Sequence, residues 1–235
     1  MAQFDISITS HCNAACPSCK RYPDYGSYIV NPDQKLHHNL NQTHMDFDVF
    51  KNVIEKNINN FKRKRVSYEG ELGDPLTHPH VKKFIDYGCE IFSDLLIVTN
   101  GGNRTPQFYK SLGDRHRNLA MCFSIDGMHD DTNQIYRRKV ITKKAFENML
   151  AFSNSKYGYR RTYWQFLVFE HNFFEIPEVL NFAKENKITV YVKINRRPKF
   201  LISKKRELIA KNLYEKHKFS NKRKPYEKSI FMFAN

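Results

Sequence analysis

The sequence contains no uninterrupted apolar run near the length of about 18 residues that a membrane-spanning helix needs. Its amino terminus also lacks a basic segment followed by an apolar stretch, which is the pattern of a secretory signal. A length of 235 residues is sufficient to bury a full core in one domain. We therefore predict a cytoplasmic protein with no membrane partner.

Cysteine is scarce, and the count of five is odd. A secreted domain held together by disulfides would need an even set at spaced positions, so such a framework is not expected. Cys89 and Cys122 each stand alone in the sequence. We interpret both as structural, with Cys122 in an apolar strand that is covered on both faces.

Acidic residues are few beside basic ones, and the formal net charge is +15 at pH 7. Residues 193–235 contain fourteen Lys or Arg against three Glu, so most of the excess lies near the carboxyl end. Such a segment favours a polyanionic partner, because binding to phosphates releases counterions. A chain biased toward Lys, Asn, Ile, Phe and Tyr, with solvated basic faces, explains the same numbers. Both interpretations stay open.

Apolar patterning predicts six strands that alternate with helices. The strands are expected at residues 4–9, 66–68, 95–98, 120–125, 163–169 and 188–194. The helices are expected at residues 47–61, 79–87, 106–113, 143–153, 176–185 and 203–218, with residues 20–45 as a long insertion. Alternation of this kind predicts an α/β fold with parallel strands and right-handed crossovers. We expect a core over residues 1–200 and a carboxyl-terminal helix and basic tail over residues 201–235, with regular structure broken at 221–225.

Three thiols follow the first predicted strand, in the run Cys12-Asn-Ala-Ala-Cys16-Pro-Ser-Cys19. Two thiols suggest a redox pair and four a closed structural metal site. Three on one loop can hold three irons of a cubane cluster and leave the fourth iron open for chemistry. The alternative is a structural zinc loop. The residues that could complete it are His11, His78 and His80.

The CxxxCxxC spacing after a first strand resembles the cluster loop of the radical S-adenosylmethionine (radical SAM) enzymes. Later segments extend the resemblance: Gly-Asp-Pro-Leu-Thr-His-Pro at 73–79, Val-Thr-Asn-Gly at 98–101 and Phe-Ser-Ile-Asp-Gly at 123–127. Together with residues 164–172, the set is similar to a group of stand-alone radical SAM proteins of bacteria and their phages. The resemblance implies a partial (β/α)6 TIM-like barrel with parallel strands, open on one side.

The resemblance also implies the cofactors, a 4Fe-4S cluster and S-adenosylmethionine. Cys12, Cys16 and Cys19 would bind three irons, while the amino and carboxylate groups of S-adenosylmethionine chelate the fourth. The residues implied for S-adenosylmethionine binding are Gly73, Asp74, Pro75, Thr99, Asn100, Ser124, Asp126, Arg137 and Gln165. Each of these motifs falls at the carboxyl end of a predicted strand, where parallel barrels build their active sites.

Individual roles follow from the same resemblance. The Gly73-Asp74-Pro75 segment would hydrogen-bond the amino group of S-adenosylmethionine through backbone carbonyls. Ser124 and Asp126 would contact its ribose. Arg137 would pair with its carboxylate, since a planar guanidinium can donate two parallel hydrogen bonds. The only tryptophan is assigned to packing. Further candidates for the substrate or adenine side are Phe169, Lys193 and Asn195.

Several positions keep a competing interpretation. Glu71 offers a second alignment for the acid of the Gly-Asp-Pro segment, and Asp74 could be a surface turn residue. Asp126 could cap a turn, and Arg138 could replace Arg137. Residues 99–101 could form a plain loop. The family often has an aromatic residue directly before the third cysteine, where this chain has Ser, so Tyr22 or a later side chain is a candidate for its role.

We therefore predict a radical SAM enzyme that takes one electron from a flavodoxin- or ferredoxin-like reductant. It would cleave S-adenosylmethionine to a 5′-deoxyadenosyl radical that abstracts hydrogen from a substrate, with RNA or a peptide or protein favoured. No cysteine cluster follows Cys122, which argues against auxiliary iron–sulfur clusters. The alternative is a non-catalytic iron–sulfur or zinc protein that binds nucleic acid through its basic tail.

Overall fold

The computed structural model describes residues 4–24, 35–196, 201–221 and 224–233. Within these residues one sheet has the strand order β1-β2-β3-β4-β5-β6-β8-β7. The strands are β1 (Phe4–Asp5), β2 (Arg65–Tyr68), β3 (Asp94–Thr99), β4 (Leu119–Ser124), β5 (Thr162–Val168), β6 (Thr189–Ile194), β7 (Ser220–Asn221) and β8 (Lys224–Phe233). Every neighbouring pair is parallel except β7 with β8. The predicted α/β fold with parallel strands is confirmed.

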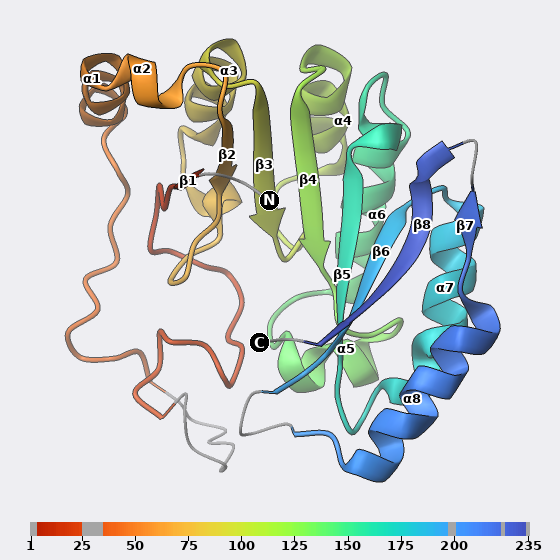
Figure 1. Cartoon of the computed structure of the whole chain (residues 1–235). Coiled ribbons are helices and arrows are strands. Elements are labelled where there is room, and N and C mark those ends of the chain that lie inside the picture. Colours follow the sequence, from red (N-terminus) through yellow and green to blue (C-terminus); the bar gives the residue numbers. More distant parts are fainter. Residues whose placement is uncertain (1–3, 25–34, 197–200, 222–223, 234–235) are drawn as a thin grey trace.

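Helices separate most of the strands along the chain (Figure 1). They are α1 (Phe47–Lys56), α2 (Ile58–Phe61), α3 (Val81–Ile91), α4 (Pro106–Arg115), α5 (Asp130–Tyr136), α6 (Thr142–Ser153), α7 (Ile176–Glu185) and α8 (Lys204–His217). Short 3-10 turns lie at Pro75–Thr77, Gly158–Arg160 and Phe173–Glu175. None of the helices in the described parts of the chain is long and apolar enough to cross a membrane.

Local sequence explains where several helices begin. The Asp46 carboxylate accepts hydrogen bonds from the first backbone N–H groups of α1, and Ser203 caps α8 in the same way. Thr105 caps α4, and Pro106 follows at a position where a missing N–H costs nothing. The helix predicted over residues 47–61 is divided at Asn57 into α1 and α2.

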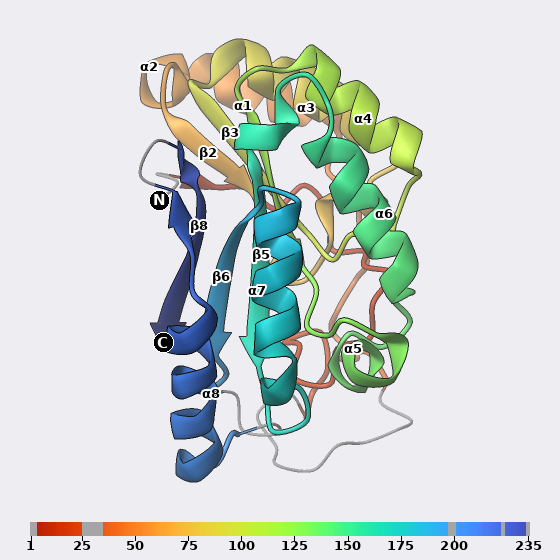
Figure 2. The ribbon, with the colours of Figure 1, turned by 90° about the vertical axis from the view of Figure 1, so that its right-hand side faces the viewer.

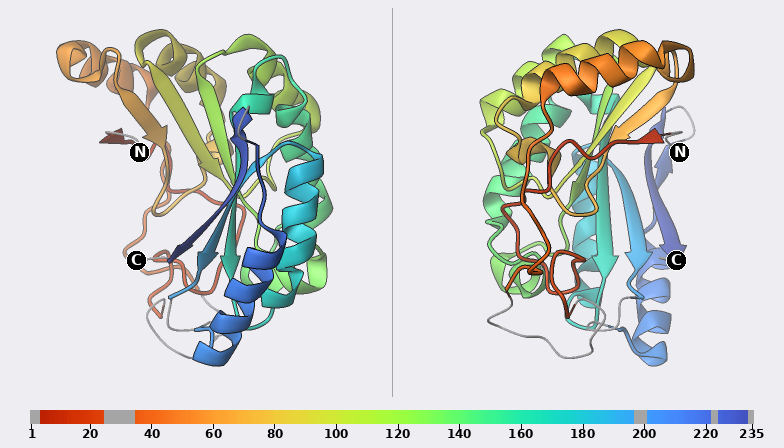
Figure 3. Two further views of the ribbon diagram at one scale, coloured as in Figure 1. Left: turned by 45° about the vertical axis from the view of Figure 1, so that its right-hand side comes forward. Right: turned by 90° about the vertical axis from the view of Figure 1, so that its left-hand side faces the viewer.

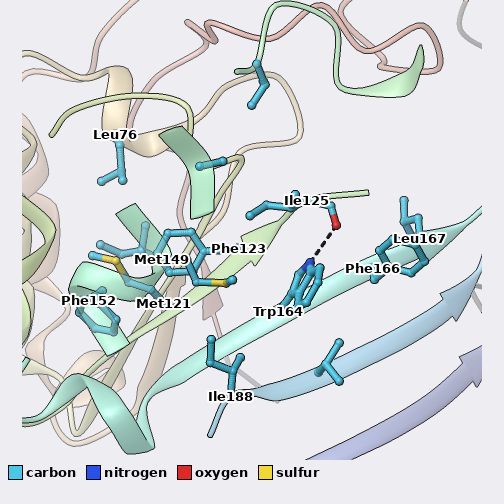
Figure 4. Packing of buried hydrophobic residues seen from close by; sticks show 14 of the residues in the cluster. Leu76, Met121, Phe123, Ile125, Met149, Phe152, Trp164, Phe166, Leu167 and Ile188 are labelled. Carbon is cyan, nitrogen blue, oxygen red and sulfur yellow. Dashed lines mark hydrogen bonds between the residues drawn. The ribbon is translucent and has the colours of Figure 1, made fainter. Parts of the chain in front are cut away.

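The helices cover one face of the sheet, as the side views in Figures 2 and 3 show. α3 packs on β3, α6 on β5 and α7 on β6. Trp164 of β5 is fully buried on this face, where its indole N–H donates to the carbonyl of Ile125 at 2.8 Å (Figure 4). The expected packing role of Trp164 is confirmed.

Within the described residues, no helix lies on the other face of the sheet (Figures 2 and 3). Tyr163 and Gln165 of β5 and Tyr191 and Lys193 of β6 point to this face and are half-buried, whereas Leu167 and Thr189 on the same face are buried. Cys122 of β4 lies on the helix-free side and is half-buried. Ala120 and Ser124, which point to the same side of β4 as Cys122, are both buried, so β4 is covered on both faces as expected.

Two further differences concern the chain ends of the sheet. Only Phe4–Asp5 pairs as a strand where residues 4–9 were expected, because the chain then turns into the cysteine loop. Near the carboxyl end, residues 224–233 form β8, which pairs in parallel with β6. The expected break at 221–225 falls between β7 and β8, and in part outside the described residues. The division of the chain at residue 200 stays a prediction.

Candidate functional site

The carboxyl ends of the strands meet the cysteine loop around a cavity of about 590 Å³. This is within the range of small-molecule sites, roughly 300–1,000 Å³. Its lining includes ten of the predicted site residues: Cys12, Cys16, Cys19, Gly73, Asp74, Thr99, Asn100, Ser124, Arg137 and Gln165. Pro75 and Asp126 lie outside the lining. Figure 3 (right) shows the amino-terminal segment, in red, beside the ends of the strands that carry the other residues.

The cysteine loop is held by Arg21, a buried residue that also lines the cavity. One terminal nitrogen of its guanidinium donates to the carbonyls of Cys12 and Ala14, at 3.4 and 3.3 Å. The other donates to the side-chain oxygen of Gln42 at 2.8 Å. Arg21 thereby ties the loop to the insertion that follows it. Sequence analysis missed this residue, since a basic side chain beside a motif gives no signal of burial.

The thiols face several hydrogen-bond donors. The backbone N–H of Ala14 lies 3.4 Å from Cys12 Sγ, and Asn100 Nδ2 lies 3.7 Å from it. Arg137 Nη1 lies 3.9 Å from Cys16 Sγ. Burial and the nearby Asp74 carboxylate raise the pKa of Cys12 to about 12. The thiol stays protonated without a metal, and a bound cation would be needed to replace that proton.

Three thiols on one loop at one cavity, with donors directed at two sulfurs, form a set that suits an iron–sulfur cluster. The zinc alternative loses His78 as a candidate ligand, because both of its ring nitrogens are hydrogen-bonded. Its Nε2 lies 2.9 Å from the Met45 carbonyl, and its Nδ1 accepts from the backbone N–H of His80. Among the described residues, no three His, Cys, Asp or Glu side chains are grouped so that they could hold one metal ion, and this includes the three thiols. A cubane cluster takes one thiolate on each iron and does not need such a group.

Gly73 packs directly against the start of the cysteine loop. A Cβ atom at this position would overlap the carbonyl oxygen of Thr9 and lie 2.9 Å from that of His11. The next residue continues the contact, since the backbone N–H of Asp74 donates to His11 O at 2.8 Å. Glycine is therefore required here by the approach of two protein segments, independently of any cofactor.

The Asp74 carboxylate organises the end of the third strand. It accepts hydrogen bonds from Thr99 Oγ1 and from the backbone N–H groups of Asn100 and Leu76, at 2.8–3.1 Å. Burial raises its pKa, and these hydrogen bonds act in the opposite direction. Asp74 is thus a buried residue that joins two strand ends, unlike the exposed Glu71, which pairs with Lys20.

Arg137 lies at the cavity with its guanidinium bound to a buried acid. Its Nε donates to Asp126 Oδ2 at 2.6 Å, and Asp126 Oδ1 accepts from the backbone N–H of Leu167 at 2.8 Å. Burial is the largest single influence and acts to lower the pKa of Arg137, but the Asp126 carboxylate together with Cys16 and Tyr136 raises it overall. The neighbouring Arg138 does not line the cavity, and its carbonyl accepts from the N–H of Ala15. Of these two neighbouring arginines, Arg137 is the one that lines the cavity.

The remaining predicted residues lie along the ends of the middle strands. Ser124 and Gln165 are register partners on β4 and β5, and both line the cavity. Asn100 exchanges side-chain hydrogen bonds with Asn13 of the cysteine loop. Tyr22 is buried but does not line the cavity, whereas Tyr136 does.

Tyr136 was missed by the sequence analysis because α5 was not predicted. Its position next to Arg137 was the one available signal.

Comparison with solved structures identifies proteins of the same fold. Streptococcus suis SuiB bound to S-adenosylmethionine has a TM-score of 0.66 with 12% identity, over 99% of this chain and 50% of that one. SuiB bound to the precursor peptide SuiA has the same TM-score with 13% identity, over 99% and 48%. anSMEcpe with bound S-adenosylmethionine also gives 0.66, with 16% identity over 90% and 56%.

The chain therefore spans about half the length of the solved structures that it matches. At these identities the likeness establishes the fold, and the partial barrel implied by the sequence resemblance is confirmed. No family model matches the sequence. A search of curated proteins likewise finds no match.

Proposed function

We propose that the chain is a radical SAM enzyme in which Cys12, Cys16 and Cys19 hold a 4Fe-4S cluster beside S-adenosylmethionine. When bound, these groups supply reductive cleavage of the sulfonium to methionine and a 5′-deoxyadenosyl radical, which abstracts hydrogen from a substrate. The observation that carries the proposal is the cavity, because it collects three thiols, the ends of three strands and Gln165 of a fourth. The fold shared with structures bound to S-adenosylmethionine supports it.

The chain's own residues would bind and orient the cofactor. Arg137 would donate to the methionine carboxylate, with Asp126 fixing the direction of its guanidinium. Carbonyls of residues 73–75 would accept from the amino group. Thr99, Asn100, Ser124 and Gln165 would contact the nucleoside or the methionine. Asp74 would act through Thr99 and Asn100, since its own oxygens are already hydrogen-bonded to them.

The proposed chemistry also needs partners. A flavodoxin- or ferredoxin-like protein would supply one electron to the cluster. Reduced cysteines are required as ligands, which agrees with the predicted cytoplasmic location.

For the substrate we propose a peptide or protein. SuiB, which shares the fold, has been solved with its precursor peptide bound. RNA is the second candidate because of the basic carboxyl-terminal segment. However, β8 within that segment pairs with β6, so part of it is committed to the sheet.

The test is anaerobic reconstitution with iron and sulfide, followed by dithionite and S-adenosylmethionine. We expect 5′-deoxyadenosine from the wild type and none from Cys16→Ala. Cys89→Ala is the matched control, because this cysteine lies away from the cavity and should leave the product unchanged. Zinc binding without a cluster or cleavage would favour the alternative, a metal-stabilised nucleic-acid-binding protein.

A further inference from the structure

The helix-free face of the sheet carries a polar group of which the proposed cofactor site uses one member, Gln165. Tyr163 and Gln165 of β5 and Tyr191 and Lys193 of β6 point to this face, and all four are half-buried. Gln165 is paired in register with Tyr191, and Lys193 lies two residues further along β6. Gln165 also lines the cavity, so this group is continuous with the candidate active site.

Lys193 has a neutral partner where a half-buried ammonium would normally have an acid. Its Nζ donates to Gln165 Oε1 at 2.6 Å, and no carboxylate of the described residues forms an ion pair with it. Because an ammonium can only donate, the Gln165 amide must turn its oxygen toward Lys193 and its NH2 group away. The pair therefore presents N–H donors from two neighbouring strands and a positive charge that forms no ion pair within the described residues.

An acid lies on the opposite side of the same face. Glu69 directly follows β2, which is separated from β6 by three strands, yet Lys193 acts on the pKa of Glu69. Burial and the nearby Asp5 raise the pKa of Glu69. This face thus carries a cation on β6 and an acid directly after β2.

We propose that Lys193 and Gln165 form a carboxylate-binding subsite, and that the substrate is a peptide that presents an Asp or Glu side chain to it. The assignment rests on the proposed function, because it names the kind of peptide that the same cavity would accept. A carboxylate has two oxygens, which suit donors from Lys193 and from the Gln165 amide. The cofactor carboxylate has a separate cation at Arg137, on the side of the cysteine loop.

The charges around the subsite favour a single carboxylate over a nucleic acid. Glu69 and Glu71 both line the cavity, and Asp5 lies close to Glu69. A continuous phosphate backbone would be repelled by these acids, whereas one acidic side chain can reach Lys193 and leave them in contact with neutral or basic parts of a peptide. Tyr163 and Tyr191, whose rings lie 6.0 Å apart, add an apolar surface for such a segment.

The test is selection of random dodecapeptides by mRNA display on the reconstituted full chain with S-adenosylmethionine present. Wild type should enrich Asp or Glu at one position, and Lys193→Met should lose that preference roughly tenfold or more, the effect of one hydrogen bond to a charged group. Lys193→Glu should select Lys or Arg at the same position. Lys184→Glu, which makes the same change at an exposed site on α7, should select as wild type does.

No acidic preference in wild type, or the same preference in Lys193→Glu, would overturn the subsite. Enrichment of a random RNA pool that depends on Lys193 would also overturn it. A third contradicting result would be that Lys193→Met loses more S-adenosylmethionine binding than peptide binding. Far-ultraviolet circular dichroism of both Lys193 variants checks that each is folded. The selection measures binding only, so failure of 5′-deoxyadenosine formation would count against the proposed chemistry and leave the subsite result standing.

Discussion

The guanidinium of Arg137 and the carboxylate of Asp126 lie 2.6 Å apart, with the acid side chain fully buried and the Arg side chain 15% exposed. Asp126 is two residues beyond the end of β4, and Arg137 directly follows α5. Asp126 also accepts from the backbone N–H of Leu167. The Asp126 carboxylate therefore fixes the guanidinium of Arg137 at the cavity and joins the ends of two strands. It would thus orient Arg137, the proposed cofactor contact, without touching the cofactor itself.

Asp126→Asn should leave Arg137 charged without its partner. We expect the free energy of unfolding to fall by about 3–5 kcal/mol, the usual effect of removing one member of a buried pair. The affinity for S-adenosylmethionine should fall as well, because the guanidinium loses its fixed direction. Urea unfolding and equilibrium dialysis measure the two effects. In the double variant with Arg137→Gln, stability should recover in part while affinity does not; full recovery of both would contradict the proposed role of Arg137.

Arg21→Leu should impair the cysteine loop. The substitution removes the donors to the carbonyls of Cys12 and Ala14, and each buried carbonyl left unpaired costs about 1–3 kcal/mol. We expect a lower melting temperature and less iron per chain after anaerobic reconstitution. Lys20→Leu is the matched control, because the adjacent Lys20 pairs with Glu71 at the surface. Equal iron content in the two variants would show that the loop does not depend on Arg21.

Gly73→Ala tests whether the glycine is needed by the protein fold itself. The added methyl group would meet backbone carbonyls of the cysteine loop, which cannot move without displacing that loop. We expect a loss of about 1–3 kcal/mol in urea unfolding of the apo protein. Gly102→Ala should cost less, because a methyl group there meets side-chain atoms of Asn13, Val140 and Asn100 at 3.0–3.1 Å. The opposite order of the two variants would argue against a purely structural requirement at Gly73.

The sequence predicted where the strands lie and which polar motif follows each of them. Buried parallel strands appear in a sequence as short apolar runs that end in polar motifs. β2 to β6 lie within a few residues of the predicted ranges. α5 was missed, since its seven residues at Asp130–Tyr136 lack a clear apolar period. β8 was missed for a related reason, because Lys and Pro dominate its start and its position depends on the free edge of β6.

The site could be predicted only in part. Ten of the predicted residues line one cavity, since the carboxyl ends of parallel strands share an edge. What each residue does there was not readable from the sequence. Asp74 and Asp126 have their oxygens occupied by backbone and side-chain donors of other strands, and such long-range hydrogen bonds leave no local pattern. The hydrogen bond between Lys193 and Gln165 is visible only once β5 and β6 are paired.

Removal of residues 219–235 should destabilise the chain instead of simply reducing its charge. β8 pairs with β6 from Val190 opposite Ser229 to Ile194 opposite Phe233, so truncation leaves β6 as an exposed edge strand. We expect a lower melting temperature and concentration-dependent aggregation, measured by thermal unfolding and light scattering. A truncated chain as stable as wild type would mean that β8 contributes little to the sheet.

The same pairing determines how nucleic-acid binding should be tested. Because truncation disturbs the sheet, a loss of RNA binding after truncation would not identify the charged groups responsible. The full chain with Lys204, Lys205 and Lys216 changed to Gln removes three exposed charges of α8 and leaves β8 in place. If the basic segment binds RNA, this variant should keep its melting temperature, lose affinity and show a shallower dependence of affinity on salt. If the basic residues are a solvated face, affinity and salt dependence should both match wild type.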